Sequence, residues 1–327
     1  MATPIHPQNV IALVWDFDKT LIPGSMQAPI FKEYGIEEAH FWREVNALPA
    51  YYSRMGVNVS PDNAYLNHLI TYVAHGLMQG LTNAKLRDLG ARIVFHPGLP
   101  ELFPHLQRVL EEVPDAGRFE LHLEHYIVSA GLKAMIEGSA IRECVDGIWA
   151  SEFIEAPAPP NFDPLATTKL DENDKPVPLF PMTGITQIAI AYDNTSKTRA
   201  LFEINKGSNK NPAIDVNATV AKEDRRVPFA NMVYVADGPS DVPAFSVVRH
   251  NGGTAFAVYD DNDPISLEQA DNLRREGRVD HFGPTDYRIG SSTERWLSLR
   301  VRQIAQGIIE QRREALKKSV GTVPRHI

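Results

Sequence analysis

One short segment of the sequence combines residue types and a spacing that suit reactive-site chemistry. Asp16 and Asp18 are separated by Phe17, and Thr20 follows two residues later. Residues i and i+2 of an extended segment share a face, so we expect the two carboxylates on the same side of the chain. Neighbouring carboxylates repel each other unless a cation or a shared proton accompanies them. The segment therefore predicts a functional acidic site and not an ordinary acidic turn.

A second acidic cluster lies far along the chain. Asp237 and Gly238 directly follow the apolar run Met232–Ala236, and Asp241 comes three residues after the glycine. Two acids and a glycine on a turn at the end of a strand form a specific arrangement. We expect this cluster to join the first one in a single site.

Two weaker signals gain meaning only beside these acids. Ser129 follows the apolar triplet 126–128, and a serine after a strand is more typical of a turn or a helix cap. Lys197 lies in a predicted helix, where a lysine is usually solvated. Alone, neither residue predicts a site.

The acids follow segments that are typical of buried strands. Val10–Trp15 is a short apolar run rich in β-branched residues, and Met232–Ala236 and Thr254–Tyr259 are similar. Strands that alternate with helices predict an α/β fold with a mainly parallel sheet, in which ligands bind at the carboxyl ends of the strands. The other predicted elements are strands at 121–128 and 147–154 and helices at 102–110, 132–137 and 195–205, the last ended by Gly207.

Two stretches interrupt this alternation. Residues 23–93 show helix-like apolar spacing with breakers such as Pro49 and Pro61, which predicts a helical insertion. Residues 155–181 are rich in proline and charge, which predicts a loop or flap. Near the C-terminus, 291–294 resembles a capping box that begins a helix. The apolar stripe of that helix, expected to pack on the body of the protein, is Leu297, Val301, Ile304 and Ile308.

In this order and spacing, the four polar clusters resemble the signature of the haloacid dehalogenase-like (HAD) hydrolase superfamily over about residues 10–259. The resemblance is to the phosphoserine-phosphatase-like branch, with a helical cap after the first motif. It implies a Rossmann-like core formed by residues 1–22 and 94–327 and an inserted cap formed by 23–93. The insertion at 155–181 lies where members of that branch carry a smaller flap.

The resemblance also implies a role for each motif residue. Asp16 is the expected nucleophile that attacks phosphorus, and Asp18 is the expected residue that protonates the leaving oxygen and later activates water. The residues expected to bind phosphate oxygens are Thr20, Ser129, Ala130 and Lys197.

Mg²⁺ is the cofactor that the resemblance implies. Its expected ligands are the carboxylates of Asp16 and Asp237 and the backbone carbonyl of Asp18, with Gly238 and Asp241 in support. Hard oxygen ligands suit Mg²⁺. Without a cation, four carboxylates would repel an anionic substrate, so charge favours the same cofactor.

The reaction class follows from the same motifs. Asp18 favours cleavage of a phosphate ester, because a C–Cl dehalogenase has no alkoxide leaving group to protonate. Phosphonate cleavage in this superfamily needs a cap lysine, and nothing in the sequence marks Lys32 or Lys85 as desolvated. The alternatives are a phosphotransferase or phosphomutase on the same fold, or a non-catalytic protein that binds a phosphorylated ligand.

A small phosphorylated metabolite is the expected partner. Residues 22–27 lack the acid that phosphoserine phosphatases use near this position to hold an amino group, which argues against an amino-acid phosphate. Four polar side chains of the insertion could contact a substrate, although each is more typical of a surface or packing position. They are Arg43, Arg54, His68 and His75.

Composition and charge argue against some other classes of partner. A net charge of −8 argues against nucleic acid or an anionic membrane as the main partner. The single cysteine, Cys144, excludes an intramolecular disulfide. The sequence shows no signal peptide and no apolar run of membrane-spanning length, so we expect a cytoplasmic protein. It makes no prediction of oligomeric state.

Overall fold

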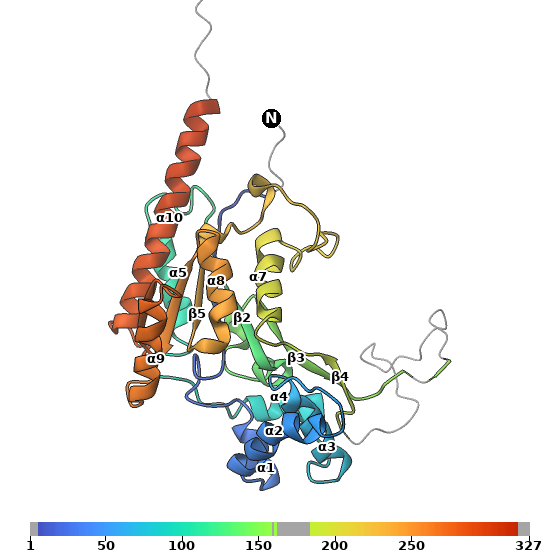
Figure 1. Cartoon of the computed structure of the whole chain (residues 1–327). Coiled ribbons are helices and arrows are strands. Elements are labelled where there is room, and N and C mark those ends of the chain that lie inside the picture. The colour runs from blue at the N-terminus through green and yellow to red at the C-terminus, as the bar shows by residue number, and fades with distance from the viewer. Residues whose placement is uncertain (1–5, 159, 162–183, 320–327) are drawn as a thin grey trace, which may run out of the picture.

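A single mainly parallel sheet forms the centre of the structure (Figure 1). The computed structural model describes residues 6–158, 160–161 and 184–319, and within them seven strands pair in the order β4-β3-β2-β1-β5-β6-β7. Only the β3–β4 pair is antiparallel among these strands. Without β4, the order is that of the doubly wound Rossmann-like sheet, so the predicted fold class is confirmed. The strands are β1 (Val10–Trp15), β2 (His122–Leu132), β3 (Gly147–Ile154), β4 (Gln187–Ile190), β5 (Met232–Ala236), β6 (Thr254–Tyr259) and β7 (His281–Pro284).

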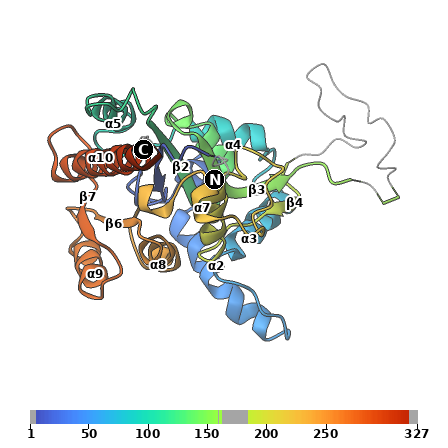
Figure 2. The same cartoon turned by 90° about the horizontal axis from the view of Figure 1, so that it is seen from above.

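Helices cover both faces of the sheet (Figure 2). One face carries α5 (Leu102–Glu111) and α10 (Ser292–Ser319), and the other carries α7 (Ser196–Lys206), α8 (Val242–His250) and α9 (Pro264–Arg275). The side chains of β1 alternate between these layers, because successive strand residues point to opposite faces. Leu13 and Trp15 join the hydrophobic cluster of α5 and α10, while Ala12 and Val14 join the cluster of α7 and α8.

The predicted elements match the structure closely, with one difference that concerns the site. The strand predicted to end before Ser129 continues to Leu132, and its pairing with β3 becomes irregular between Val128 and Leu132. Ser129 is therefore held within the end of β2 and not on a free turn. Helix α7 ends as predicted at Gly207, whose φ of 85° is the left-handed conformation that favours glycine.

The segment between β1 and α5 is helical, as predicted, and lies beyond the carboxyl ends of the strands (Figure 1). Its buried side chains share one hydrophobic cluster with Trp15 of the sheet. The contact between α4 and α6 is especially close, because a Cβ on Gly90 would lie 2.1 Å from the carbonyl oxygen of Met135. The helices are α1 (Ala28–Tyr34), α2 (Glu38–Ser53), α3 (Ala64–Ala74) and α4 (Asn83–Gly90), and α4 packs against α6 (Lys133–Glu137).

Two sequence predictions about domains stay predictions. One is that residues 23–93 form an inserted cap. Most of the predicted flap at 155–181 lies outside the described residues.

The C-terminal helix begins and packs as the sequence indicates. The Ser291 hydroxyl accepts a hydrogen bond from the backbone N–H of Glu294 at 3.1 Å. The Glu294 carboxylate accepts from Gly290, one residue before the position of a standard capping box. The predicted apolar stripe is buried against the body of the protein. None of the helices in the described ranges combines the length and apolar character needed to cross a membrane.

Candidate active site

The two acidic clusters meet where β1 and β5 end side by side. The backbone N–H of Asp16 donates to the carbonyl oxygen of Val235 at 2.9 Å, which continues the β1–β5 ladder by one residue. Asp237 follows β5 directly, so the two acids emerge from adjacent strands. This is the point of a doubly wound sheet where the strand order reverses and ligands bind.

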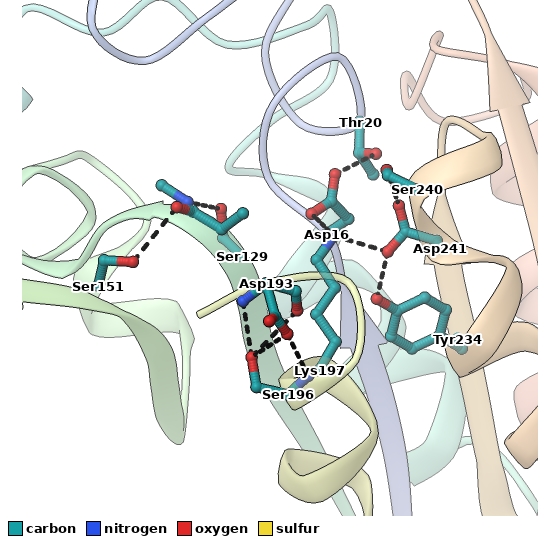
Figure 3. Close-up of polar contacts among 12 residues, drawn as sticks. Asp16, Thr20, Ser129, Ser151, Asp193, Ser196, Lys197, Tyr234, Ser240 and Asp241 are labelled. Carbon is teal, nitrogen blue, oxygen red and sulfur yellow. Dashed lines mark hydrogen bonds and ion pairs between the residues drawn. The ribbon is translucent and has the colours of Figure 1, made fainter. Parts of the chain in front are cut away.

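Lys197 reaches this site from the first turn of α7. The Asp193 carboxylate caps that turn, accepting hydrogen bonds from the backbone N–H groups of Thr195 at 2.9 Å and Ser196 at 2.6 Å. The Lys197 ammonium donates to a carboxylate oxygen of Asp16 and to one of Asp241, each at 2.7 Å (Figure 3). The lysine is only 2% exposed, so the usual expectation of a solvated helical lysine fails here.

The charge of Lys197 is maintained by its two partners. Burial alone lowers the pKa of a lysine, but the carboxylates of Asp16 and Asp241 raise the pKa of Lys197 above its usual value. The side chain is therefore an ammonium at neutral pH, fixed between two acids.

Asp241 is oriented by neighbours on both of its oxygens. The Tyr234 hydroxyl donates to Oδ1 at 2.6 Å, and the Ser240 hydroxyl donates to Oδ2 at 2.9 Å (Figure 3). Asp241 is fully buried, and a buried carboxylate is stable only when its oxygens have such partners. The arrangement holds Asp241 against Lys197.

Three carboxylates at this edge can together hold a metal ion. Oxygen atoms of Asp16, Asp237 and Asp241 all lie within 4.8 Å of one another. Burial and mutual repulsion raise the pKa of Asp237 to about 8, and burial raises that of Asp16 to about 6 against the opposing effect of Lys197. This crowding of negative charge and the all-oxygen donor set fit a hard divalent cation. The structure thus brings together the predicted ligands Asp16 and Asp237.

Asp18 lies beside these groups but faces a different neighbour. Its Oδ1 accepts a hydrogen bond from the backbone N–H of Met26 at 2.8 Å. Burial and the charge of Asp16 raise the pKa of Asp18 to about 7, so this carboxyl can be protonated near neutral pH. Asp18 also lines a cavity of about 280 Å³ between the sheet and the helical insertion. It therefore lies between the acidic cluster and a space that can hold the rest of a substrate.

The remaining predicted residues border the same site. The Thr20 hydroxyl is buried, 3.4 Å from a carboxylate oxygen of Asp16. The Ser129 hydroxyl, also buried, accepts from the backbone N–H of Gly131 at 3.0 Å. Ala130 lines the cavity that Asp18 borders. Their side chains and backbone groups supply neutral hydrogen-bonding partners around the charged centre.

Comparison with known proteins gives a relative that aligns with most of the chain. No model of a known protein family matches the chain. A protein of Borreliella burgdorferi, described only as uncharacterized, is 36% identical over 295 residues, which cover 89% of this chain and 96% of that protein. The chain belongs to the same family as this Borreliella protein.

Similar solved structures are more distant in sequence. One is a HAD family hydrolase from Salmonella enterica serovar Typhi, 16% identical with a TM-score of 0.46 over 85% of this chain and 67% of that chain. Another is a phosphoserine phosphatase in its apo form, 15% identical with a TM-score of 0.45 over 83% and 92%. A probable phosphoserine phosphatase from Vibrio cholerae is 14% identical, with a TM-score of 0.47 over 93% and 68%.

The structure brings the four predicted motif segments together. They are far apart in the chain and meet at one edge of a Rossmann-like sheet. The fold places an acid after β1, a serine at the end of β2, a lysine at the start of α7 and acids after β5. Membership of the HAD-like superfamily stays a prediction from these motifs.

Several residues of this site were not predicted from the sequence. Tyr234 lies in an apolar strand, and nothing in its surroundings indicates that its hydroxyl contacts Asp241. The cavity beside Asp18 is walled by insertion residues that include Trp42 and Tyr65. Its described lining contains none of the four insertion residues that the sequence suggested. One of these, His68, instead forms an ion pair or hydrogen bond with Glu44 at 2.9 Å.

Tyr65 links the helical insertion to the end of β2. Its buried hydroxyl donates to the carbonyl oxygen of Ala130 at 2.6 Å. We expect Tyr65→Phe to lower the free energy of unfolding by about 0.5–1.5 kcal/mol, because the substitution leaves the Ala130 carbonyl oxygen with only the longer hydrogen bond of 3.4 Å from the Ser151 hydroxyl. Urea denaturation measures the change, and Tyr51→Phe is the matched control, since Tyr51 is 53% exposed on α2. Equal stability of the two variants would contradict the link.

Proposed function

We propose that the protein is a Mg²⁺-dependent phosphohydrolase that cleaves a small-molecule phosphate monoester through an aspartyl-phosphate on Asp16. One observation supports this most strongly. The buried Lys197 ammonium lies 2.7 Å from both Asp16 and Asp241, within a cluster of carboxylates that also includes Asp237. A nucleophilic carboxylate, a fixed cation and a set of metal ligands are the parts that phosphoryl transfer needs, because its catalysis is mainly positioning and neutralisation of charge.

Mg²⁺ fits the residues present. The proposed ligands are the carboxylates of Asp16 and Asp237 and the backbone carbonyl of Asp18, while Asp241 keeps Lys197 in position. When bound, the ion would neutralise charge on the phosphoryl oxygens and on the crowded carboxylates. Lys197 would provide a second positive charge beside Asp16.

In the first half of the proposed reaction, a carboxylate oxygen of Asp16 attacks phosphorus in line with the ester oxygen. The bond between phosphorus and the leaving oxygen breaks, and Asp18 donates its proton to that oxygen. Thr20, Ser129 and the backbone N–H of Ala130 donate hydrogen bonds to the phosphoryl oxygens. The products are a free alcohol and a phosphorylated Asp16.

In the second half, water attacks the phosphorus of the aspartyl-phosphate. Asp18, now a carboxylate, takes a proton from this water. The bond between phosphorus and Asp16 breaks, which releases inorganic phosphate and restores both acids. The same two residues thus complete the cycle.

Metal removal tests the proposal. We expect native protein to release inorganic phosphate from an aryl phosphate in Mg²⁺ buffer, and a chelator to reduce the rate by at least about 100-fold, since several kcal/mol of charge stabilisation would be lost. Excess Mg²⁺ should restore the rate. Equal yields of alcohol and inorganic phosphate would distinguish hydrolysis from transfer to another acceptor. Phosphate release that is insensitive to the chelator would refute the metal dependence.

A further inference from the structure

The cavity beside Asp18 has a composition that indicates what kind of leaving group it accepts. Ala130 and Gly131 of the end of β2 line it together with Asp18, so this part of the lining adjoins the reacting centre. Other lining residues belong to the helical insertion, among them Trp42 of α2 and Tyr65 of α3. A phosphate held at Asp16 would place the alcohol part of its ester in this space.

The charged groups beyond Asp18 are balanced. Among the described lining residues, Lys19 is the one cation and Asp62 is the one further acid. No arginine is among them, although arginine is the usual partner for a carboxylate or a second phosphate. The lining therefore gives no net charge that would select an ionic leaving group of either sign.

The other lining groups suit hydroxyls. Gln27 and Asn46 contribute side-chain amides, and an amide both donates and accepts hydrogen bonds, as a hydroxyl does. Gln27 is only 3% exposed and accepts from the Ser25 hydroxyl at 2.6 Å, so its orientation is fixed. Trp42 and Tyr65, with ring centroids 5.9 Å apart, add aromatic surface that can contact the C–H groups of a ligand.

We infer that the leaving group is a small, uncharged, polyhydroxylated alcohol, so that the substrate is a polyol or monosaccharide phosphate. This inference rests on the proposed phosphohydrolase function and adds the class of substrate to it. The cavity of about 280 Å³ lies just below the ~300–1,000 Å³ of sites for drug-sized ligands, so it favours a leaving group smaller than a nucleoside. Asn46 is the specificity-determining residue that the test addresses, because it is exposed on α2 and its replacement leaves the buried core unchanged.

A substrate panel tests the class. Phosphate release would be measured with glycerol 3-phosphate, sorbitol 6-phosphate and glucose 6-phosphate, and with phosphocholine, 3-phosphoglycerate and AMP as cationic, anionic and nucleotide competitors. An aryl phosphate, whose leaving group lacks the hydroxyls of a polyol, measures phosphate release without recognition of such hydroxyls. We expect kcat/KM for the best neutral polyol or sugar phosphate to exceed that of each competitor by at least about tenfold, as the loss of one or more hydrogen bonds would give. A competitor that equals or exceeds it would overturn the inference, and turnover of the aryl phosphate would show that the proposed function still stands. Failure of every compound, the aryl phosphate included, would overturn both.

A pair of variants tests the residue. Asn46→Leu should lower kcat/KM for the preferred polyol or sugar phosphate by about tenfold through KM, with less than about a twofold change for the aryl phosphate. Asn67→Leu is the matched control, because Asn67 is also an exposed asparagine of the insertion but lies outside the cavity lining. It should leave both values unchanged. Equal losses on both substrates, or no loss in Asn46→Leu, would overturn the role of Asn46.

Discussion

Asp16→Asn protein is expected to lose phosphate release by at least about 10⁴-fold while it remains folded. Removal of a nucleophile from a covalent mechanism costs up to about 10⁶-fold in kcat, because the remaining groups cannot replace the attacking atom. Asparagine has the size of aspartate and keeps an oxygen that can accept the hydrogen bond from Lys197. The substitution also removes one charge from a crowded set of acids, so we expect little change in the stability of the fold.

The comparison would be made at saturating Mg²⁺, with circular dichroism and thermal unfolding to establish that the variant is native-like. Asp88→Asn is the matched control, since Asp88 is an exposed acid on α4, away from the site. Its activity should equal that of native protein. Retention of more than about 1% of native activity by Asp16→Asn would exclude Asp16 as the nucleophile, because removal of a nucleophile reduces kcat by far more than about 100-fold.

The strands of the sheet were predictable because of where they are buried. Val10–Trp15, Met232–Ala236 and Thr254–Tyr259 are covered on both faces, so nearly every position in them must be apolar. Such uninterrupted apolar runs are visible without knowledge of the partners. The polar clusters that follow them were also predictable as one site, because parallel strands bring their carboxyl ends to a common edge.

The edges of the sheet were not predictable in the same way. β4 and β7 have only four residues each, and β7 contains His281, Gly283 and Pro284. Residues with weak strand preference form β7 because β6 offers an unpaired edge beside them. Tertiary pairing and not local sequence decides these strands, and likewise the helices α8 and α9 were not identified from their short, mixed patterns.

Within the site, the sequence indicated which residues react but not what surrounds them. The contact of Tyr234 with Asp241 depends on the turn after β5, and the cap that Asp193 forms depends on the direction in which the chain enters α7. The cavity walls depend on how α2 and α3 fold back over the sheet. Side chains such as Asn46 carry no local pattern that distinguishes a cavity position from a surface one.

The second large effect concerns Lys197. We expect Lys197→Met to reduce the free energy of unfolding by roughly 3–5 kcal/mol in the absence of divalent cations, because it leaves Asp16 and Asp241 buried without their counter-charge. Methionine fills the space of the lysine stem, so the loss would arise from charge and not from a cavity. Urea denaturation at neutral pH in chelator measures this change. Phosphate release, measured separately in Mg²⁺ buffer, should also fall.

A control on the same helix separates this effect from a general loss of surface charge. Arg199 is exposed on α7 and forms an ion pair with Glu203 one helical turn later, and Glu203 also accepts a hydrogen bond from Trp149 at 2.7 Å. Arg199→Met should change the free energy of unfolding by no more than about 0.5 kcal/mol, as is usual for exposed ion pairs. Destabilisation of both variants to the same extent would contradict the prediction, because it would mean that the buried ion pairs of Lys197 stabilise the fold no more than an exposed ion pair does.

Mg²⁺ should change the stability of the Lys197→Met variant more than that of native protein. A cation bound to Asp16 and Asp237 stabilises the folded state in proportion to the logarithm of its concentration over its dissociation constant. Once the ammonium is gone, the carboxylates hold more uncompensated negative charge and should bind the ion more tightly. Addition of Mg²⁺ should therefore restore part of the lost stability without restoring activity, because the phosphoryl group still lacks the cation on the Lys197 side. A variant whose stability is indifferent to Mg²⁺ would show that these carboxylates are not the metal ligands.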